Sequence, residues 1–96
     1  GGLTENVPRF LPEGLGVEMD LDAWDLPPVF AWLRDQGGME QAEILKTFNC
    51  GIGMVLAVEA ERAEALSALL QDAGETVYRL GHVTQTEGVA YTGRLG

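Results

Sequence analysis

The only cysteine of the chain, Cys50, is the first residue whose type could do chemistry. It lies in the stretch KTFNCGIGMVLAV, between Asn49 and Gly51 and just before an apolar run. A thiol becomes a strong nucleophile when a neighbouring cation or base lowers its pKa, and the sequence offers no acid–base partner close by. A lone cysteine beside an apolar strand is usually a small buried hydrophobic residue. We therefore expect Cys50 to pack in the core, within a helix-to-strand turn shaped by Asn49, Gly51 and Gly53.

Two glycines at the start of the chain, Gly1 and Gly2, form a second candidate site because they run into a predicted helix start. Glycine lets the backbone approach a ligand closely, and the amides and dipole at a helix start favour an anion. A glycine turn that only shapes the chain has the same local sequence. Asn6 could point its amide at a ligand or exchange hydrogen bonds with the neighbouring turn, so both interpretations stay open.

No other polar residue indicates a metal site or a nucleophile. His82 lies in a strand-like run, and no second metal-ligating residue stands at a diagnostic spacing from it, so a structural role is expected. Trp24 and Trp32 are expected to pack in the core or against a partner. The sequence therefore assigns no catalytic residue and no metal ligand.

Length and charge limit the classes of function. Ninety-six residues make one domain at most, and 46% hydrophobic with 22% charged residues is typical of a folded globular domain. Fifteen acidic against six basic side chains give a net charge of −9, which disfavours nucleic acid and anionic membrane surfaces as partners. No apolar run reaches the roughly 18 residues of a membrane-spanning helix. The single cysteine favours a reducing, cytoplasmic setting.

Periodicity and glycine or proline punctuation predict helices and strands in an alternating order. The run Met54–Val58 is too short for a helix and apolar throughout, so it is predicted as a strand buried on both faces at the centre of the sheet. Gly51 is expected to cap the helix before it. The predicted elements are a helix in residues 3–11, a half-buried strand at 17–21, helices at 28–37, 40–48 and 61–73, and strands at 54–58, 76–83 and 89–92.

Three segments resemble one enzyme family. GGLTENVPRFLP (1–12), PPVFAWLRDQGG (27–38) and EILKTFNCGIGMVLAV (43–58) are similar, in the same order and at similar intervals, to aminoimidazole ribonucleotide synthetase, also called phosphoribosylformylglycinamidine cyclo-ligase. LGHV (80–83) is similar to a short strand near that enzyme's C-terminus. The resemblance covers most of this chain but only about the last third of the family's usual length, and the final residues carry little family information.

The resemblance implies an α+β fold with a mixed β-sheet and helices packed against it, partly ferredoxin-like. Residues 1–96 would form the larger part of the C-terminal domain of a two-domain enzyme, without its N-terminal ATP-binding domain. On this resemblance Gly1, Gly2 and Asn6 match the glycine turn and helix start that face the cleft and are expected to bind substrate. The turn formed by Asn49, Cys50, Gly51 and Gly53 matches a helix-to-strand junction near the cleft and is expected to be structural.

The resemblance also implies an activity for the full-length protein. That protein would convert formylglycinamidine ribonucleotide to aminoimidazole ribonucleotide in purine biosynthesis, using ATP and Mg²⁺, as a cytoplasmic homodimer. This chain alone is expected to be inactive and to bind no cofactor. The alternatives are a related superfamily enzyme (formylglycinamide ribonucleotide amidotransferase, selenophosphate synthetase or thiamine monophosphate kinase) and a noncatalytic interaction module.

Overall fold

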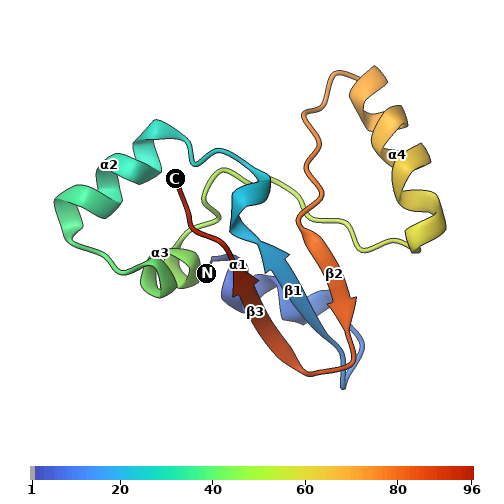
Figure 1. The fold of residues 1–96 in the computed structure, drawn as a ribbon, viewed down its shortest axis with the longest axis horizontal. Helices are drawn as coiled ribbons and strands as arrows, with labels where there is room; N and C mark the ends of the chain where they lie inside the picture. Colours follow the sequence, from blue (N-terminus) through green and yellow to red (C-terminus); the bar gives the residue numbers. More distant parts are fainter. Residues whose placement is uncertain (1) are drawn as a thin grey trace.

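The computed structural model describes residues 2–96, in which short helices surround a small sheet (Figure 1). Two 3-10 turns, η1 and η2, lie among the helices and strands. The elements in chain order are α1 (Leu3–Asn6), η1 (Val7–Phe10), β1 (Gly16–Asp20), η2 (Leu21–Ala23), α2 (Pro28–Gly37), α3 (Gln41–Thr47), α4 (Ala60–Asp72), β2 (Gly81–Thr84) and β3 (Gly88–Thr92).

The sheet has the strand order β2-β1-β3, so β1 is its central strand. β1 pairs antiparallel with β2, where Met19 faces Gly81, and parallel with β3, where Asp20 faces Thr92. The strands pass so closely that a Cβ on Gly81 would collide with the carbonyl oxygen of Glu18. A mixed sheet with helices beside it confirms the expected α+β class.

The hydrophobic core lies where α1, η1 and α3 meet the sheet. Apolar side chains from these helices, from β1 and from the segment after it are buried together, and Leu95 joins them from the chain end. The largest completely buried side chains are Met19, Leu21, Ile44, Leu45 and Cys50. The strand predicted at 17–21 is present as β1, one residue earlier, with Met19 in the core and Asp20 exposed, whereas Leu21 is buried from the turn η2.

Glycines end the two long helices as the sequence predicts. Gly38 follows α2 with a φ of 62°, in the left-handed region that glycine adopts most readily. After α4, the N–H of Gly74 donates to the carbonyl oxygen of Gln71 and the N–H of Glu75 donates to that of Leu70. This pair of bonds is a Schellman motif, which satisfies two of the carbonyl groups that a helix end leaves unpaired.

The prediction of a buried central strand at Met54–Val58 is wrong for this chain. These residues form no strand within residues 2–96, Met54 is 80% exposed and Leu56 is 53% exposed. An apolar run becomes a strand only when another strand offers its backbone for pairing, and no described segment does so here. The centre of the sheet is β1 instead.

Two further predictions need correction. The strand expected at 76–83 is shorter, because only Gly81–Thr84 pairs with β1. Gly51 does not cap α3, because the helix ends at Phe48 in an extended conformation and the left-handed residues follow two positions later.

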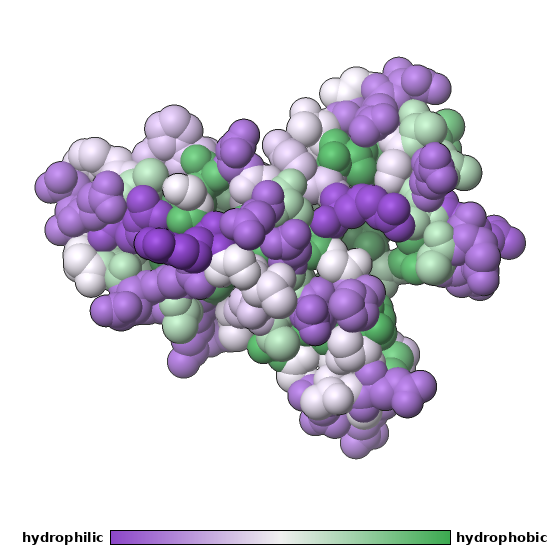
Figure 2. Space-filling view, viewed as in Figure 1, coloured by the Kyte–Doolittle hydropathy of each residue, from purple (hydrophilic) through white to green (hydrophobic). Residues whose placement is uncertain are grey.

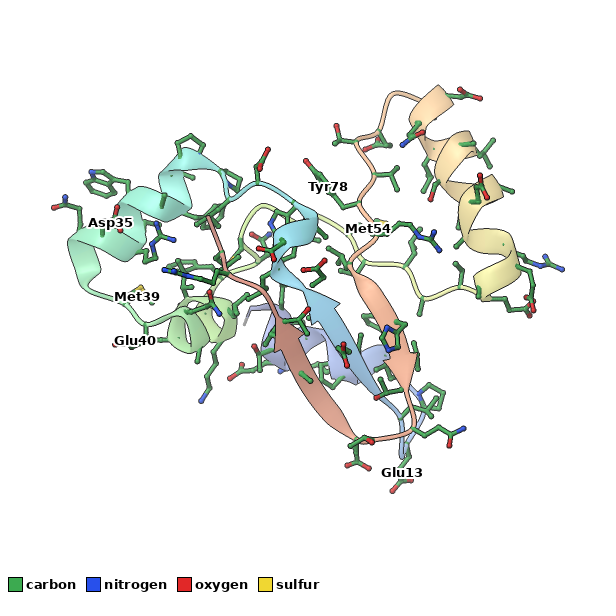
Figure 3. All side chains as sticks on the ribbon, in the orientation of Figure 1. Glu13, Asp35, Met39, Glu40, Met54 and Tyr78 are labelled. Carbon is green, nitrogen blue, oxygen red and sulfur yellow. The ribbon has the colours of Figure 1, made fainter. Side chains whose placement is uncertain are left out.

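The segment from Gly53 to Leu80, here called the arm, extends away from the sheet and carries α4 at its far end (Figure 1). No residue of α4 is buried, and Leu69 on its apolar face is 65% exposed. Figure 2 shows apolar surface where the arm meets the rest of the molecule, and Figure 3 labels Met54 and Tyr78 at the base of the arm. Among residues 2–96, no helix has both the length and the apolar character needed to cross a membrane.

Two methionines test this division between core and arm. We expect Met19→Ala to lower the unfolding free energy of the 96-residue chain by about 2 to 5 kcal/mol, because it empties space in a packed core. Met54→Ala should change it by less than about 0.5 kcal/mol, because that side chain is exposed. Urea unfolding of both variants checks the pair, and equal losses would show that the arm packs as tightly as the sheet.

Candidate functional site

Gly2 lies in close contact with the end of α3. Its N–H donates to the carbonyl oxygen of Lys46 over 2.8 Å, and the N–H of Leu3 donates to the carbonyl oxygen of Phe48 over 3.4 Å. A Cβ on Gly2 would collide with the carbonyl oxygen of Leu45 and lie 2.7 Å from the Phe48 nitrogen. The glycine is therefore required by the approach of two backbones, and its amide is already engaged within the protein.

Asn6 stands one helical turn further on. Its backbone N–H donates to the carbonyl oxygen of Gly2 over 3.0 Å. This bond closes one helical turn between Gly2 and Asn6, both of which are predicted to contact the ligand. The Asn6 side chain is exposed, and it makes no hydrogen bond within residues 2–96. Gly1 lies outside the described residues. Substrate binding by this group stays a prediction, and Asn6 is the member whose side chain points to solvent.

The turn from Asn49 to Gly53 has an unusual backbone. Cys50 has a φ of 55° and Gly51 a φ of 95°, so two successive residues lie in the left-handed region. The Asn49 side chain supports the turn by accepting a hydrogen bond from the Gly51 N–H over 3.3 Å. A Cβ on Gly51 would lie 2.5 Å from Cγ of Pro27, whereas a Cβ on Gly53 would meet no atom within 4 Å. Local packing thus explains Gly51 but gives no reason for Gly53.

Cys50 is held at the base of this turn by both its backbone and its thiol. Its carbonyl oxygen accepts a buried hydrogen bond from Nε1 of Trp24 over 3.0 Å. Its Sγ lies 3.8 Å from the carbonyl oxygen of Ile44 and 3.7 Å from that of Phe48, so the thiol acts as a weak donor. Burial raises the pKa of the Cys50 thiol, which stays protonated near neutral pH and is a poor nucleophile.

The structure brings the two predicted groups together. Gly2 packs on Phe48, the residue directly before Asn49, so the glycine turn lies next to the turn from Asn49 to Gly53. A contact that the sequence did not reveal, between the Thr4 hydroxyl and the Tyr91 hydroxyl at 2.7 Å, ties α1 to β3. Burial raises the pKa of Tyr91, the hydrogen bond to Thr4 opposes this rise, and the nearby Cys50 adds to it.

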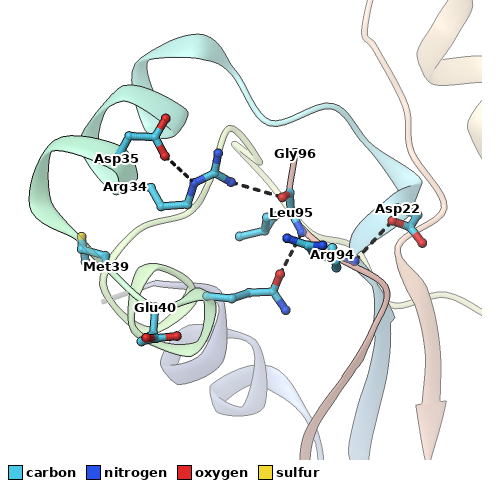
Figure 4. A pocket seen from close by; sticks show the side chains of 9 residues that line it. Asp22, Arg34, Asp35, Met39, Glu40, Arg94, Leu95 and Gly96 are labelled. Atoms are coloured by element: carbon cyan, nitrogen blue, oxygen red, sulfur yellow. Dashed lines mark hydrogen bonds and ion pairs between the residues drawn. The ribbon is translucent and has the colours of Figure 1, made fainter.

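A hollow of about 780 Å³ lies between α2, α3 and the chain end (Figure 4). Its polar side chains hold the backbone of the last residues. Arg34 donates to the Leu95 carbonyl oxygen over 3.2 Å, and Gln41 accepts from the Leu95 N–H over 2.9 Å. Asp22 accepts from the Arg94 N–H over 3.3 Å. Sequence reasoning missed these residues because their partners lie 54 to 72 positions away.

A metal ion has no protein site in the described part of the chain. Residues 2–96 contain no group of three His, Cys, Asp or Glu side chains placed to hold one. The residues present therefore do not fit a Mg²⁺ site by themselves.

Comparison with known proteins identifies a family and relatives of this chain. The family described as AIR synthase related protein, C-terminal domain, matches residues 1–93. A phosphoribosylformylglycinamidine cyclo-ligase of Neisseria meningitidis serogroup C (strain 053442) is 52% identical over 88 residues, which cover 92% of this chain. The chain spans about a quarter (26%) of the length of that curated relative.

Two glycines of the turn give a first test of the site. Gly51→Ala should destabilise the 96-residue chain by about 1 to 3 kcal/mol, because φ is positive and the new Cβ meets Pro27. Gly53→Ala should change the unfolding free energy by less than about 0.5 kcal/mol, because the new Cβ enters open space. Thermal and urea unfolding compare the two, and an equal loss would mean that both glycines are fixed by packing.

The thiol of Cys50 gives a second test, because its raised pKa makes stability depend on pH. The unfolded thiol ionises near its ordinary pKa of 9.0 while the buried one keeps its proton, so the stabilisation is complete below that pH and is lost above it. We expect the unfolding free energy to fall as pH rises above 9.0. Cys50→Ala should cost about 1 to 2 kcal/mol at pH 7 and flatten this fall. An unchanged slope in urea unfolding at several pH values would contradict this account.

Proposed function

The chain belongs to the AIR synthase related protein family, whose C-terminal domain it matches, and from this premise we propose that it is the C-terminal portion of a phosphoribosylformylglycinamidine cyclo-ligase. The observation that carries the proposal is the identity of more than half its aligned residues with a relative of that name, across nine-tenths of the chain.

The proposed reaction is the ATP-dependent closure of an imidazole ring. The formyl oxygen of formylglycinamidine ribonucleotide is a poor leaving group, so the γ-phosphoryl group of ATP is transferred to it and ADP is released. An amidine nitrogen then attacks the activated carbon, and the C–O bond breaks to release phosphate as the ring closes to aminoimidazole ribonucleotide. Catalysis of such a transfer consists mainly of positioning and charge stabilisation.

The chain's own share in this reaction would be to complete the active-site cleft. Asn6 is the residue we assign to substrate binding, because its amide is exposed and offers both a donor and an acceptor. Gly2 holds α1 rigidly on α3, so the position of Asn6 is fixed by backbone contacts. With a net charge of −9, the chain adds no attraction for phosphates, and the groups that bind ATP and Mg²⁺ would lie in the rest of the enzyme.

The same proposal places the enzyme in the cytoplasm as a homodimer. A noncatalytic interaction module is the alternative from another class of function. The reading frame around these residues separates the two, since an ATP-binding domain in the same polypeptide would exclude a free-standing module.

Activity of the longer polypeptide tests the proposed function directly. We expect the full-length protein to form aminoimidazole ribonucleotide from formylglycinamidine ribonucleotide, ATP and Mg²⁺, and the 96-residue chain to form none. Product and ADP are measured together, and they should appear in equal amounts. A full-length protein that binds ATP but leaves this substrate unchanged would refute the assignment.

A substitution at Asn6 tests the assigned contact. Asn6→Ala in the full-length enzyme should lower kcat/KM by about tenfold or more, because it removes one hydrogen bond to substrate, and should leave the melting temperature unchanged. Gln36→Ala is the matched control, because Gln36 is an exposed amide on α2 away from the glycine turn. Equal activity of the two variants would show that Asn6 does not touch the substrate.

A further inference from the structure

The arm contains a segment with the properties of a strand but no partner. Residues Met54–Val58 carry no charge, and three of their five side chains are large, apolar and exposed. Within residues 2–96, no backbone hydrogen bond is made by residues 53–58. Val55, the second residue of the segment, packs against the core, so the segment is anchored at the molecule's surface. Five apolar residues with unpaired N–H and C=O groups form an open edge that readily pairs with another strand.

The surroundings of this segment indicate that a sheet continues there. The sequence runs from an extended segment through α4 to a second extended segment that leads into β2, which is the pattern of a β-α-β unit. In such a unit the helix packs on the sheet that its two strands share, but here no residue of α4 is buried. β2 lies at an edge of the sheet and is bonded only to β1, so its outer side is open.

The uncovered surface has a definite shape and chemistry. Val58 and α4 enclose an open groove of about 450 Å³, lined by Ala65, Leu66 and Leu69 with Arg62 at its margin. Tyr78 and Met54 add exposed apolar area at the base of the arm (Figure 3), and Leu56, two residues after Met54, is also exposed. An apolar groove beside an unpaired backbone suits an apolar strand rather than a small polar ligand.

We propose that this surface is completed by at least one apolar β-strand from the longer polypeptide to which residues 1–96 belong. The strand pairs with Met54–Val58 and extends the sheet beyond β2, and α4 then covers the extended sheet. The inference rests on the proposed function in one respect, because it requires that longer polypeptide. The cyclo-ligase relative supports this source of the strand, because the part of the relative that matches this chain is only 26% of the relative's length. A second copy of the chain pairing at this same surface is the other possible occupant, and the test below distinguishes it.

Hydrogen exchange of the full-length protein tests the proposal without any assay of catalysis. The amides of residues 54–58 should exchange at least about a hundredfold more slowly than those of the exposed turn 85–87, approaching the protection of β1. In the 96-residue chain the same amides should exchange rapidly while β1 stays protected. Rapid exchange of residues 54–58 in the full-length protein would overturn the proposal, as would a gene that encodes no further residues.

Two substitutions supply a matched side-chain test. Leu56→Lys should lower the melting temperature of the full-length protein by several degrees, because it places a charge against the added strand. Val29→Lys is the control, since Val29 is exposed to a similar extent (58% against 53%) but lies on α2. Equal effects would contradict the proposal. Protection of residues 54–58 in the 96-residue chain that appears only at concentrations where sedimentation detects dimers would also contradict it, because the partner would then be a second copy.

If the full-length protein lacks cyclo-ligase activity while residues 54–58 are protected, only the proposed reaction is refuted and the inference about the sheet stands.

Discussion

The candidate site depends on one contact, the approach of the Gly2 backbone to the last turn of α3. The amide of Gly2 binds the Lys46 carbonyl group, which the end of α3 would otherwise leave unpaired, and the amide of Leu3 binds the carbonyl group of Phe48, the residue after the helix. Any side chain at position 2 would separate the two backbones. Because α1 has only four residues and little stability of its own, this contact fixes its place in the protein. The position of Asn6, and of the Thr4 hydroxyl that meets Tyr91, follows from it.

The turn at Cys50 balances strain against burial. A non-glycine residue whose backbone lies in the left-handed region lowers the stability of the fold by about 1 to 2 kcal/mol. The buried thiol and the hydrogen bond from Trp24 to the Cys50 carbonyl recover energy of the same order, about 1 kcal/mol each. Glycine would relieve the strain but would leave a void beside Ile44. The strained backbone therefore persists because the core on one side and Trp24 on the other both require it.

Features that depend on adjacent residues could be predicted from the sequence, and features that depend on residues far along the chain could not. Gly38 and Gly74 indicated the ends of α2 and α4, because the residues next to a helix end determine where the helix stops. The alternation of apolar and acidic residues around Met19 predicted β1, because successive side chains of a strand point to opposite faces. Met54–Val58 has the composition of a central strand, but pairing depends on residues that the segment itself does not specify. The hydrogen bonds of Arg34, Gln41 and Asp22 could not be predicted for the same reason, since each side chain binds the backbone of the distant chain end.

Gly51 and Gly53, the two glycines of the turn from Asn49 to Gly53, lie where the well-packed part of the chain ends. Gly51 is fixed by Pro27, and the hydrogen bonds from Trp24 and within the Asn49 turn reach no further than Ile52. A Cβ on Gly53 would meet no atom within 4 Å, and the exposed arm begins there. A strand that binds Met54–Val58 would therefore displace residues beyond Gly53 without bending the backbone at Cys50, because a free glycine absorbs the change in φ and ψ. The site around Gly2 and Cys50 can thus keep its geometry whether or not the sheet is completed.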